Sequence, residues 1–172
     1  VSAILGIRKA STFEGEASTA LEFAAEEWRS CMKKESGSTA DSPTDIVKSS
    51  NGAVEDMRSF FLNTGEIVSH LTEARLAGED PRKLAYEFHA ELAAEIIAAC
   101  EKAKRQTGIR RAALSGGVFQ NRLLLELVDE GLREKGFQVL KHSLIPPNDG
   151  GIALGQAVYG MAYINRNTGL EV

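Results

Sequence analysis

Two adjacent glycines between a short apolar run and a helical pattern are the feature that most constrains the fold of this 172-residue chain. The run at residues 109–114, IRRAAL, predicts a strand that leads into Gly116 and Gly117. Apolar residues spaced by three and four over 121–135 predict a helix, and FQVLKH at 137–142 predicts a second strand. A strand–helix–strand unit is normally parallel with a right-handed crossover, so the sequence predicts an α/β fold.

The loop SGGVFQN, which holds the glycine pair, has two interpretations. It is either a structural turn or a phosphate-binding loop, because glycines let the backbone approach a ligand and their N–H groups can act with the first donors of the helix. The sequence contains neither GxxxxGKS/T nor GxGxxG, so neither common phosphate-binding fingerprint applies. Asn121, at the end of the loop, either caps the helix or contacts a nucleotide.

A second loop, SLIPPNDGG at residues 143–151, follows the second predicted strand. Asp149 in this loop either caps the helix predicted at 152–164 or faces a metal ion. Because the two loops follow consecutive strands of one unit, we expect both at the carboxyl edge of the sheet, where open α/β folds bind ligands. The small residues of IALGQAVYG would allow the last helix to approach the sheet or a ligand closely.

The segment FEGEA places Glu14 and Glu16 on either side of Gly15, ahead of a predicted helix. A carboxylate here either accepts hydrogen bonds from ribose hydroxyls or stabilises the amino terminus of the helix. The three histidines form no HxxxH or HExxH pair, so we do not expect this chain to hold a metal through histidines by itself. His89 lies beside the apolar stripe of a helix, where a packed, hydrogen-bonded role is the ordinary interpretation.

The middle of the chain is predicted to be helical on either side of the sequence GEDPRK. A helix over about 54–77 should end at Gly78, and Asp80 with Pro81 is typical of the start of the next helix. An apolar stripe spaced by four predicts that this next helix is buried along Leu84, Phe88, Leu92, Ile96 and Cys100, and QTG at 106–108 is predicted to end it. Residues 33–54 are rich in Ser, Gly, Asp and Lys, which predicts a flexible insertion.

Composition and charge exclude several classes of function. The net charge is -4 and the basic residues are dispersed, so we expect no nucleic-acid or anionic membrane surface. No apolar run approaches the roughly 20 residues that span a bilayer, and no signal peptide is apparent, which predicts a cytoplasmic protein.

Cys31 and Cys100 are isolated and are predicted to be reduced, with Cys100 buried. The opening run VSAILGI reads as the continuation of an apolar element and indicates a fragment of a longer protein.

Together these segments resemble the HypF family of carbamoyltransferases, which act in the maturation of nickel–iron hydrogenases. Residues 112–160, from AALSGGVFQN to PPNDGGIALGQAVYG, resemble the carboxyl-terminal part of that family, VSAILGIRKASTFEGEASTALE resembles the segment before it, and LAYEFHAEL resembles its FH-containing helix. The resemblance covers nearly the whole chain outside the Ser-rich insertion. It implies that residues 1–172 are the second lobe of an actin-like ATPase (ASKHA) fold, a central mixed sheet flanked by helices, in a domain shared with the TsaD family of tRNA threonylcarbamoyl transferases.

The resemblance also assigns roles to particular residues. The positions that match nucleotide contacts of the family are Gly116, Gly117, Asn121, Gly15 and Glu14. Asp149 matches an aspartate that ligates a divalent metal (iron, zinc or magnesium), which would polarise the carbamoyl carbonyl while the glycine pair holds the leaving phosphate. The family's metal-binding HxxxH and its adenylate-forming domain are not in this sequence, so we expect the chain to be inactive alone.

The implied reaction is the transfer of a carbamoyl group to the carboxyl-terminal cysteine of HypE. The donor is carbamoyl adenylate, which a different domain makes from carbamoyl phosphate and ATP. No catalytic residue is assigned to this chain, because the attacking thiol belongs to the partner. The alternatives are a small-molecule O-carbamoyltransferase, a threonylcarbamoyl transferase, or a non-catalytic nucleotide-binding module of the ASKHA fold; the PPNDGG and FEGEA sequences favour the HypF family over the threonylcarbamoyl transferases.

Overall fold

The computed structural model describes residues 1–36, 62 and 64–168. In chain order the elements are α1 (Glu16–Ser36), α2 (Thr64–Leu76), α3 (Pro81–Thr107), β1 (Arg111–Leu114), the 3-10 helix η2 (Gly117–Gln120), α4 (Arg122–Glu134), β2 (Gln138–Lys141), the 3-10 helix η3 (Asp149–Gly151) and α5 (Ile152–Thr168). The α/β class predicted from the sequence is confirmed by this mixture of helices and parallel strands.

Local chemistry sets the ends of α3, as the sequence predicts. Asp80 is extended (φ -61°, ψ 123°) and its carboxylate accepts a hydrogen bond from the N–H of Arg82, while Pro81 takes the first helical position. At the other end Gly108 adopts φ 72°, and its N–H donates to a carbonyl of the last turn. Shortly after α2 ends, Gly78 adopts φ 93°. Glycine populates this left-handed conformation without steric cost, which is why both helices stop at this residue type.

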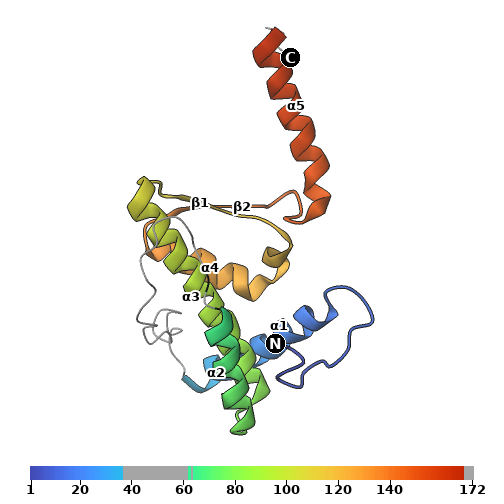
Figure 1. Ribbon diagram of the computed structural model, residues 1–172, viewed down its shortest axis with the longest axis vertical. Coiled ribbons are helices and arrows are strands. Elements are labelled where there is room, and N and C mark those ends of the chain that lie inside the picture. The colour runs from blue at the N-terminus through green and yellow to red at the C-terminus, as the bar shows by residue number, and fades with distance from the viewer. Residues whose placement is uncertain (37–61, 63, 169–172) are drawn as a thin grey trace.

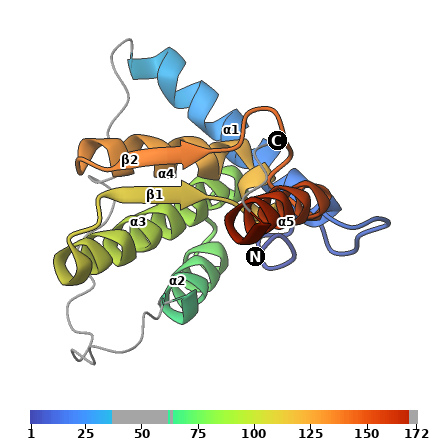
Figure 2. The same cartoon turned by 90° about the horizontal axis from the view of Figure 1, so that it is seen from above.

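β1 and β2 form a parallel pair, with Arg111 opposite Gln138 at the start of the register. α4 makes the crossover between the strands and lies against one face of the pair (Figures 1 and 2). Leu114 and Val139 point to this face and are buried, whereas Leu140 on the opposite face is 48% exposed. The predicted parallel unit is confirmed. The implied mixed sheet is not seen, because only these two strands pair within the described ranges.

The core lies between the helices and beneath the sheet, and α3 is its central element, packed against α1, α2 and α4. The buried side chains of α3 belong to Leu84, Ala85, Tyr86, His89, Ala90, Ala93 and Ile97. Of the predicted stripe, Leu84 is in this set, and Phe88, Leu92, Ile96 and Cys100 are only partly buried at its border. The predicted stripe is therefore wrong beyond Leu84. Each step of four residues rotates about 40° beyond a full helical turn, so residues spaced by four move progressively away from the buried face.

Two segments differ from their sequence predictions. Residues 1–7 form a tight turn instead of a regular apolar element, and the N–H of Leu5 donates to the first carbonyl of the turn (3.0 Å). Arg75 of α2 fixes this turn, because its Nε donates to the carbonyl of the buried Leu5 (3.1 Å). α1 continues to Ser36, into the segment predicted as an insertion. The rest of that segment, and the beginning of the helix predicted before Gly78, lie outside the described residues.

The last helix, α5, extends away from the other elements, beyond the carboxyl ends of the strands (Figures 1 and 2). Large apolar residues are exposed along it: Ile152, Leu154, Val158, Tyr159, Met161, Tyr163 and Ile164. A Cβ atom added to Gly155 or Gly160 would meet no atom within 4 Å, so the close approach to the sheet that the small residues would allow is not seen. No helix within the described ranges combines the length and the apolarity needed to cross a membrane.

Candidate functional site

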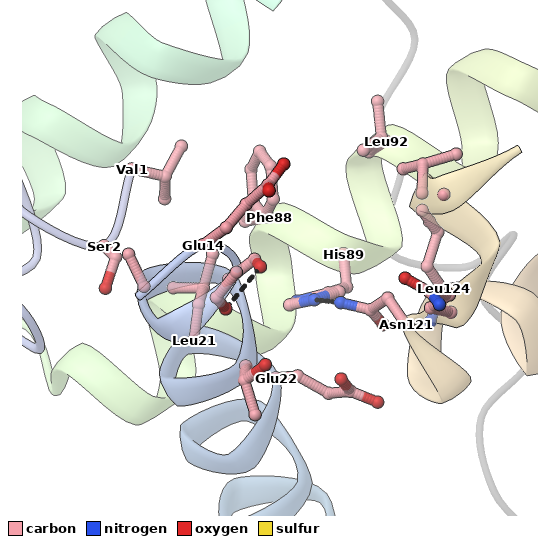
Figure 3. Close-up of a pocket in the computed structure, with 17 residues that line it drawn as sticks. Val1, Ser2, Glu14, Leu21, Glu22, Phe88, His89, Leu92, Asn121 and Leu124 are labelled. Carbon is pink, nitrogen blue, oxygen red and sulfur yellow. Dashed lines mark hydrogen bonds between the residues drawn. The ribbon is translucent and has the colours of Figure 1, made fainter. Parts of the chain in front are cut away.

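A cavity of about 540 Å³ lies between α1, α3 and the loop that follows β1 (Figure 3). Its volume falls within the roughly 300–1,000 Å³ of small-molecule sites. Four predicted nucleotide-contacting residues from two distant segments lie in its wall: Glu14, Gly15, Gly117 and Asn121. The other two predicted site residues, Gly116 and Asp149, are not in the lining. The fold therefore gathers most of the predicted site around one cavity.

The two glycine-containing loops meet at the carboxyl edge of the sheet, as the sequence predicts. The N–H of Gly116 donates to the carbonyl of Pro147 (2.8 Å), and Oγ of Ser115 lies 2.9 Å from Nε2 of His142, the residue after β2. Gly116 has φ 100° and ψ 161°, a conformation open in practice to glycine alone. The contact between the loops therefore depends on glycine at this position.

The start of α4 has fewer free donors than the loop sequence suggests. The N–H of Arg122 donates to Oε1 of Glu22 on α1 (2.7 Å), and the N–H of Leu124 donates to Oδ1 of Asn121 (2.9 Å). A carboxylate and an amide oxygen thus already use two donors that were expected to bind phosphate. Within the glycine pair, only the N–H of Gly117 has no acceptor among the described residues. An anion here would therefore meet fewer donors of the helix than the loop sequence suggests.

Asn121 is the N-cap of α4, which is one of the two roles the sequence left open, and its amide also contacts His89. Nδ2 of Asn121 lies 2.8 Å from Nε2 of His89 (Figure 3). Nδ1 of His89 lies 2.7 Å from the carbonyl oxygen of Ala85. Burial lowers the pKa of the His89 imidazole, which is therefore neutral at pH 7. The packed, hydrogen-bonded role predicted for His89 is confirmed.

The two glutamates of FEGEA have different environments. Glu16 is buried, and its Oε2 accepts hydrogen bonds from the N–H (2.5 Å) and the hydroxyl (3.0 Å) of Thr12, while Oε1 pairs with Arg8. These contacts fix the loop before α1. Glu14 is exposed and lines the cavity next to Gly15, which has φ 84°. Glu14 is therefore the glutamate of this pair that can contact a ligand.

Asp149 is not a helix cap. The cap of the short helix η3 is Asn148, whose Oδ1 accepts a hydrogen bond from the N–H of Gly150 (3.1 Å). The Asp149 carboxylate is exposed at the carboxyl edge of the sheet. No group of three His, Cys, Asp or Glu that could hold a metal occurs in residues 1–36, 62 and 64–168. One exposed carboxylate does not make a metal site, so the assignment of Asp149 as a metal ligand stays a prediction.

The cavity wall combines apolar side chains with carboxylates. The apolar part comes from residues of α1, α3, η2 and α4: Leu21, Phe88, Leu92, Val118 and Leu124. Glu14 and Glu22 add carboxylates, and no Lys or Arg of the described residues lies in the lining. Ser2 in the same wall has a buried hydroxyl oxygen without a hydrogen-bond partner in the described part of the chain. Carboxylates accept hydrogen bonds from hydroxyls and repel phosphate, so this wall suits an apolar group that carries hydroxyls.

Several contacts of the site are not predicted by the sequence. Glu22 contacts Arg122 across 100 positions and His142 contacts Ser115 across 27, and no local pattern indicates pairings of this kind. Asn148 was within reach of prediction, because asparagine is as common as aspartate at helix N-caps and directly precedes Asp149. Long-range pairings therefore needed the tertiary structure, whereas the cap did not.

The chain is therefore an α/β protein in which a cavity lies beside the glycine loop of a parallel strand–helix–strand unit. The family model described as carbamoyltransferase, Kae1-like domain, second subdomain, matches residues 1–156. The chain therefore belongs to the HypF family of carbamoyltransferases. The resemblance inferred from the motifs is therefore confirmed at the level of the family.

Curated relatives and a solved structure agree with this assignment. The probable carbamoyltransferase HypF of Methanocaldococcus jannaschii is 29% identical over 167 residues, which are 97% of this chain and 19% of that protein. Carbamoyltransferase HypF2 of Cupriavidus necator is 32% identical over 159 residues, 89% of this chain and 20% of that protein. A crystal structure of full-length HypF in the phosphate- and nucleotide-bound form matches with a TM-score of 0.75 at 29% identity, covering 95% of this chain and 19% of that one. The chain thus spans about a fifth of the length of these relatives.

Proposed function

We propose that this chain forms one wall of the nucleotide site of a carbamoyltransferase that transfers a carbamoyl group from carbamoyl adenylate to the carboxyl-terminal cysteine of HypE. The observation that carries the proposal is the convergence of Glu14, Gly15, Gly117 and Asn121 on one cavity. More than 100 residues separate the two segments in the sequence, so their meeting in space is independent of the motif match. A similar HypF with a bound nucleotide supports a nucleotide as the ligand.

The chemistry of the wall indicates how the nucleotide would lie. The apolar residues would contact the nucleoside, and Glu14 would accept a hydrogen bond from a ribose hydroxyl. The N–H of Gly117 is the donor of the glycine pair that remains for the phosphate. Because Glu22 and Asn121 already occupy two of the first three donors of α4, the phosphate would contact mainly the loop.

In this reaction the chain binds and orients the donor, and the nucleophile comes from the partner. The thiolate of the HypE cysteine attacks the carbamoyl carbon, and the bond from that carbon to the phosphate oxygen breaks. AMP leaves with the electron pair, and the thiol proton passes to solvent. A hydrogen bond from Gly117 to the leaving phosphate would stabilise the charge that develops on it.

The proposed metal has one candidate ligand in this chain, Asp149. The described residues do not fit a complete site, because no second and third ligand lie beside it, and no step of the proposed reaction uses the metal. The assignment is tested by Asp149→Ala in the full-length protein, with Glu130→Gln as a control carboxylate on the exposed surface of α4. We expect loss of bound metal and of transfer to HypE only with Asp149→Ala, and undiminished transfer would contradict the assignment.

The cavity itself is tested by Gly117→Val in the full-length protein. A Cβ atom at Gly117 meets no atom within 4 Å, so the larger side chain would enter the space that the ligand needs without disturbing the core. Gly65→Val in the exposed first turn of α2 is the matched control, because a Cβ atom there also meets open space, away from the cavity. With carbamoyl phosphate, ATP and HypE, we expect carbamoylation measured by mass spectrometry to fall about a hundredfold for Gly117→Val. Equal rates for the two variants would rule out this cavity.

A further inference from the structure

His89 and Asn121 belong to a chain of hydrogen bonds in which every donor and acceptor can be assigned. The carbonyl of Ala85 can only accept, so Nδ1 of His89 carries the proton that donates to it. The N–H of Leu124 can only donate, so the Asn121 atom beside it is Oδ1. Nδ2 of Asn121 therefore faces His89 and donates to the unprotonated Nε2 (2.8 Å). The two ends of the chain of hydrogen bonds are backbone groups of α3 and α4.

The assignment requires a neutral imidazole, and the surroundings of His89 maintain one. The side chain is 1% exposed and contacts the ring of Phe88 edge-on, with centroids 5.4 Å apart. Burial lowers the pKa of the imidazole, against the raising effects of the Ala85 carbonyl and of the carboxylates of Glu22 and Glu26 on α1. A protonated ring would place an N–H opposite the amide N–H of Asn121, and the two donors would repel each other.

This arrangement fixes the orientation of the Asn121 amide. Without His89, only one contact, from Oδ1 to the N–H of Leu124, would hold the side chain, and Nδ2 could turn. With His89, both ends of the amide are held, while one hydrogen on Nδ2 and one lone pair on Oδ1 stay available in the wall of the cavity. Figure 3 shows the two side chains pointing toward one another at this wall.

We propose that His89 is a positioning residue that holds the Asn121 amide in the orientation in which it contacts the nucleotide. The inference rests on the proposed function of the cavity, and it adds a role to a residue whose sequence pattern indicates ordinary helix packing. The role needs an acceptor at the position of Nε2, and this requirement separates positioning from packing. A purely packed residue would need only the right volume.

This requirement can be tested with two variants of the full-length protein, one of which places an acceptor at the position of Nε2 and one of which does not. In His89→Gln the amide oxygen can reach the position of Nε2 and accept from Asn121. In His89→Asn the shorter amide can donate to the carbonyl of Ala85, as Nδ1 does, but does not reach Asn121. The probe is 8-azido-ADP, and mass spectrometry of the photolabelled peptides that line the cavity reports its occupancy separately from any other nucleotide site.

If His89 positions Asn121, the concentration of 8-azido-ADP that gives half-maximal labelling should stay within about twofold of wild type for His89→Gln. For His89→Asn this concentration should rise about three- to tenfold, the range expected for one lost hydrogen bond. In an Asn121→Ala background, His89→Asn should cause no further loss, because its effect passes through Asn121. Equal weakening by the two His89 variants, or additive effects with Asn121→Ala, would overturn the inference. If Asn121→Ala alone leaves labelling unchanged, the nucleotide assignment of the cavity fails, and the inference with it.

A measurement on unmutated His89 covers the case in which a His89 variant does not fold. In full-length protein labelled with 15N-histidine, the His89 ring should show a protonated Nδ1 and an unprotonated Nε2, and its signal is assigned by its change in Asn121→Ala. Saturating ADP should shift the Nε2 resonance, because the ligand contacts the amide that donates to it. A doubly protonated ring, or a resonance unmoved by bound ADP, would contradict the positioning role.

Discussion

α4 and α5 both follow a strand and a glycine-containing loop, yet their surroundings are opposite. α4 buries a continuous face against α3 and the sheet, made of Leu123, Leu124, Leu127, Val128, Asp129, Gly131 and Leu132. α5 is as rich in apolar residues, but most of its side chains are exposed, with Tyr159 at 74% and Val158 at 59%. Apolar content alone therefore does not decide burial. Burial of a helix also requires that its apolar residues lie on one face and that another element packs against that face.

The helix α4 also shows how closely α3 is packed against it. A Cβ atom added to Gly131 would overlap the side chain of Ile97 on α3, so the absence of a side chain sets the distance between these helices. Gly155 in α5 has no such neighbour. The same residue type thus permits close packing in one helix and only lowers helix propensity in the other. The two helices can be compared directly by substitutions in the 172-residue chain.

The largest expected difference comes from truncating an apolar side chain in each helix. Leu127 is 2% exposed, and Leu127→Ala should lower the free energy of unfolding by about 3 kcal/mol, because it removes buried methyl groups and leaves a cavity. Val158→Ala in α5 should change it by less than about 0.5 kcal/mol. Urea unfolding measures both values. A cost above about 1 kcal/mol for Val158→Ala would show that α5 packs against the rest of this chain in solution, which would contradict the contrast between a buried α4 and an exposed α5.

The next effect comes from the polar contact that joins α4 to β2. Asp129 accepts hydrogen bonds from Nζ of Lys141 and Nε of Arg133, both at 2.6 Å. Asp129→Asn should cost about 1–2 kcal/mol, since it weakens two charge-assisted contacts of a buried carboxylate whose partners are half-exposed. In α5, Nδ2 of Asn167 donates to the carbonyl of Tyr163 within the same helix, and Asn167→Ala should change stability by less than about 0.5 kcal/mol.

The Asp129 contact should also depend on pH. Burial by itself would raise the pKa of the Asp129 carboxyl, but the hydrogen bonds from Lys141 and Arg133 hold it below its ordinary value. A lowered folded-state pKa means that the stabilisation is complete above the unfolded-state value of about 3.9 and is lost as the pH falls through the folded-state value. The difference in unfolding free energy between wild type and Asp129→Asn should therefore shrink from pH 7 to pH 3. A difference that grows on acidification would contradict this account.

The smallest effects should have opposite signs in the two helices. Gly131→Ala should destabilise the chain by about 1 kcal/mol, because Ile97 must move in a packed interface and the gain in helix propensity only partly compensates. Gly155→Ala should stabilise α5 by up to about 1 kcal/mol, since the new methyl group meets open space. Thermal unfolding of the two variants gives the signs. Stabilisation by both would mean that α3 and α4 are less closely packed than the structure shows.

The sequence by itself determined the features that depend on neighbouring residues. The cap and proline at Asp80 and Pro81, the glycine stops at Gly78 and Gly108, and the parallel strand–helix–strand unit all follow from local steric and hydrogen-bond preferences. The motifs also indicated the family and four residues of the cavity wall. These predictions succeeded because helix caps, turns and periodic patterns each depend on residues that are close together in the sequence.

Only the tertiary structure decided which polar groups remain available for a ligand. It satisfied the N–H of Gly116 with the carbonyl of Pro147, and it brought His89 to Asn121 from 32 positions away. It also left α5 exposed, although the small residues of this helix would allow a close approach to the sheet. A donor or acceptor is used up by whichever group the fold brings within about 3 Å of it, and this distance depends on the packing of whole helices and not on the local sequence.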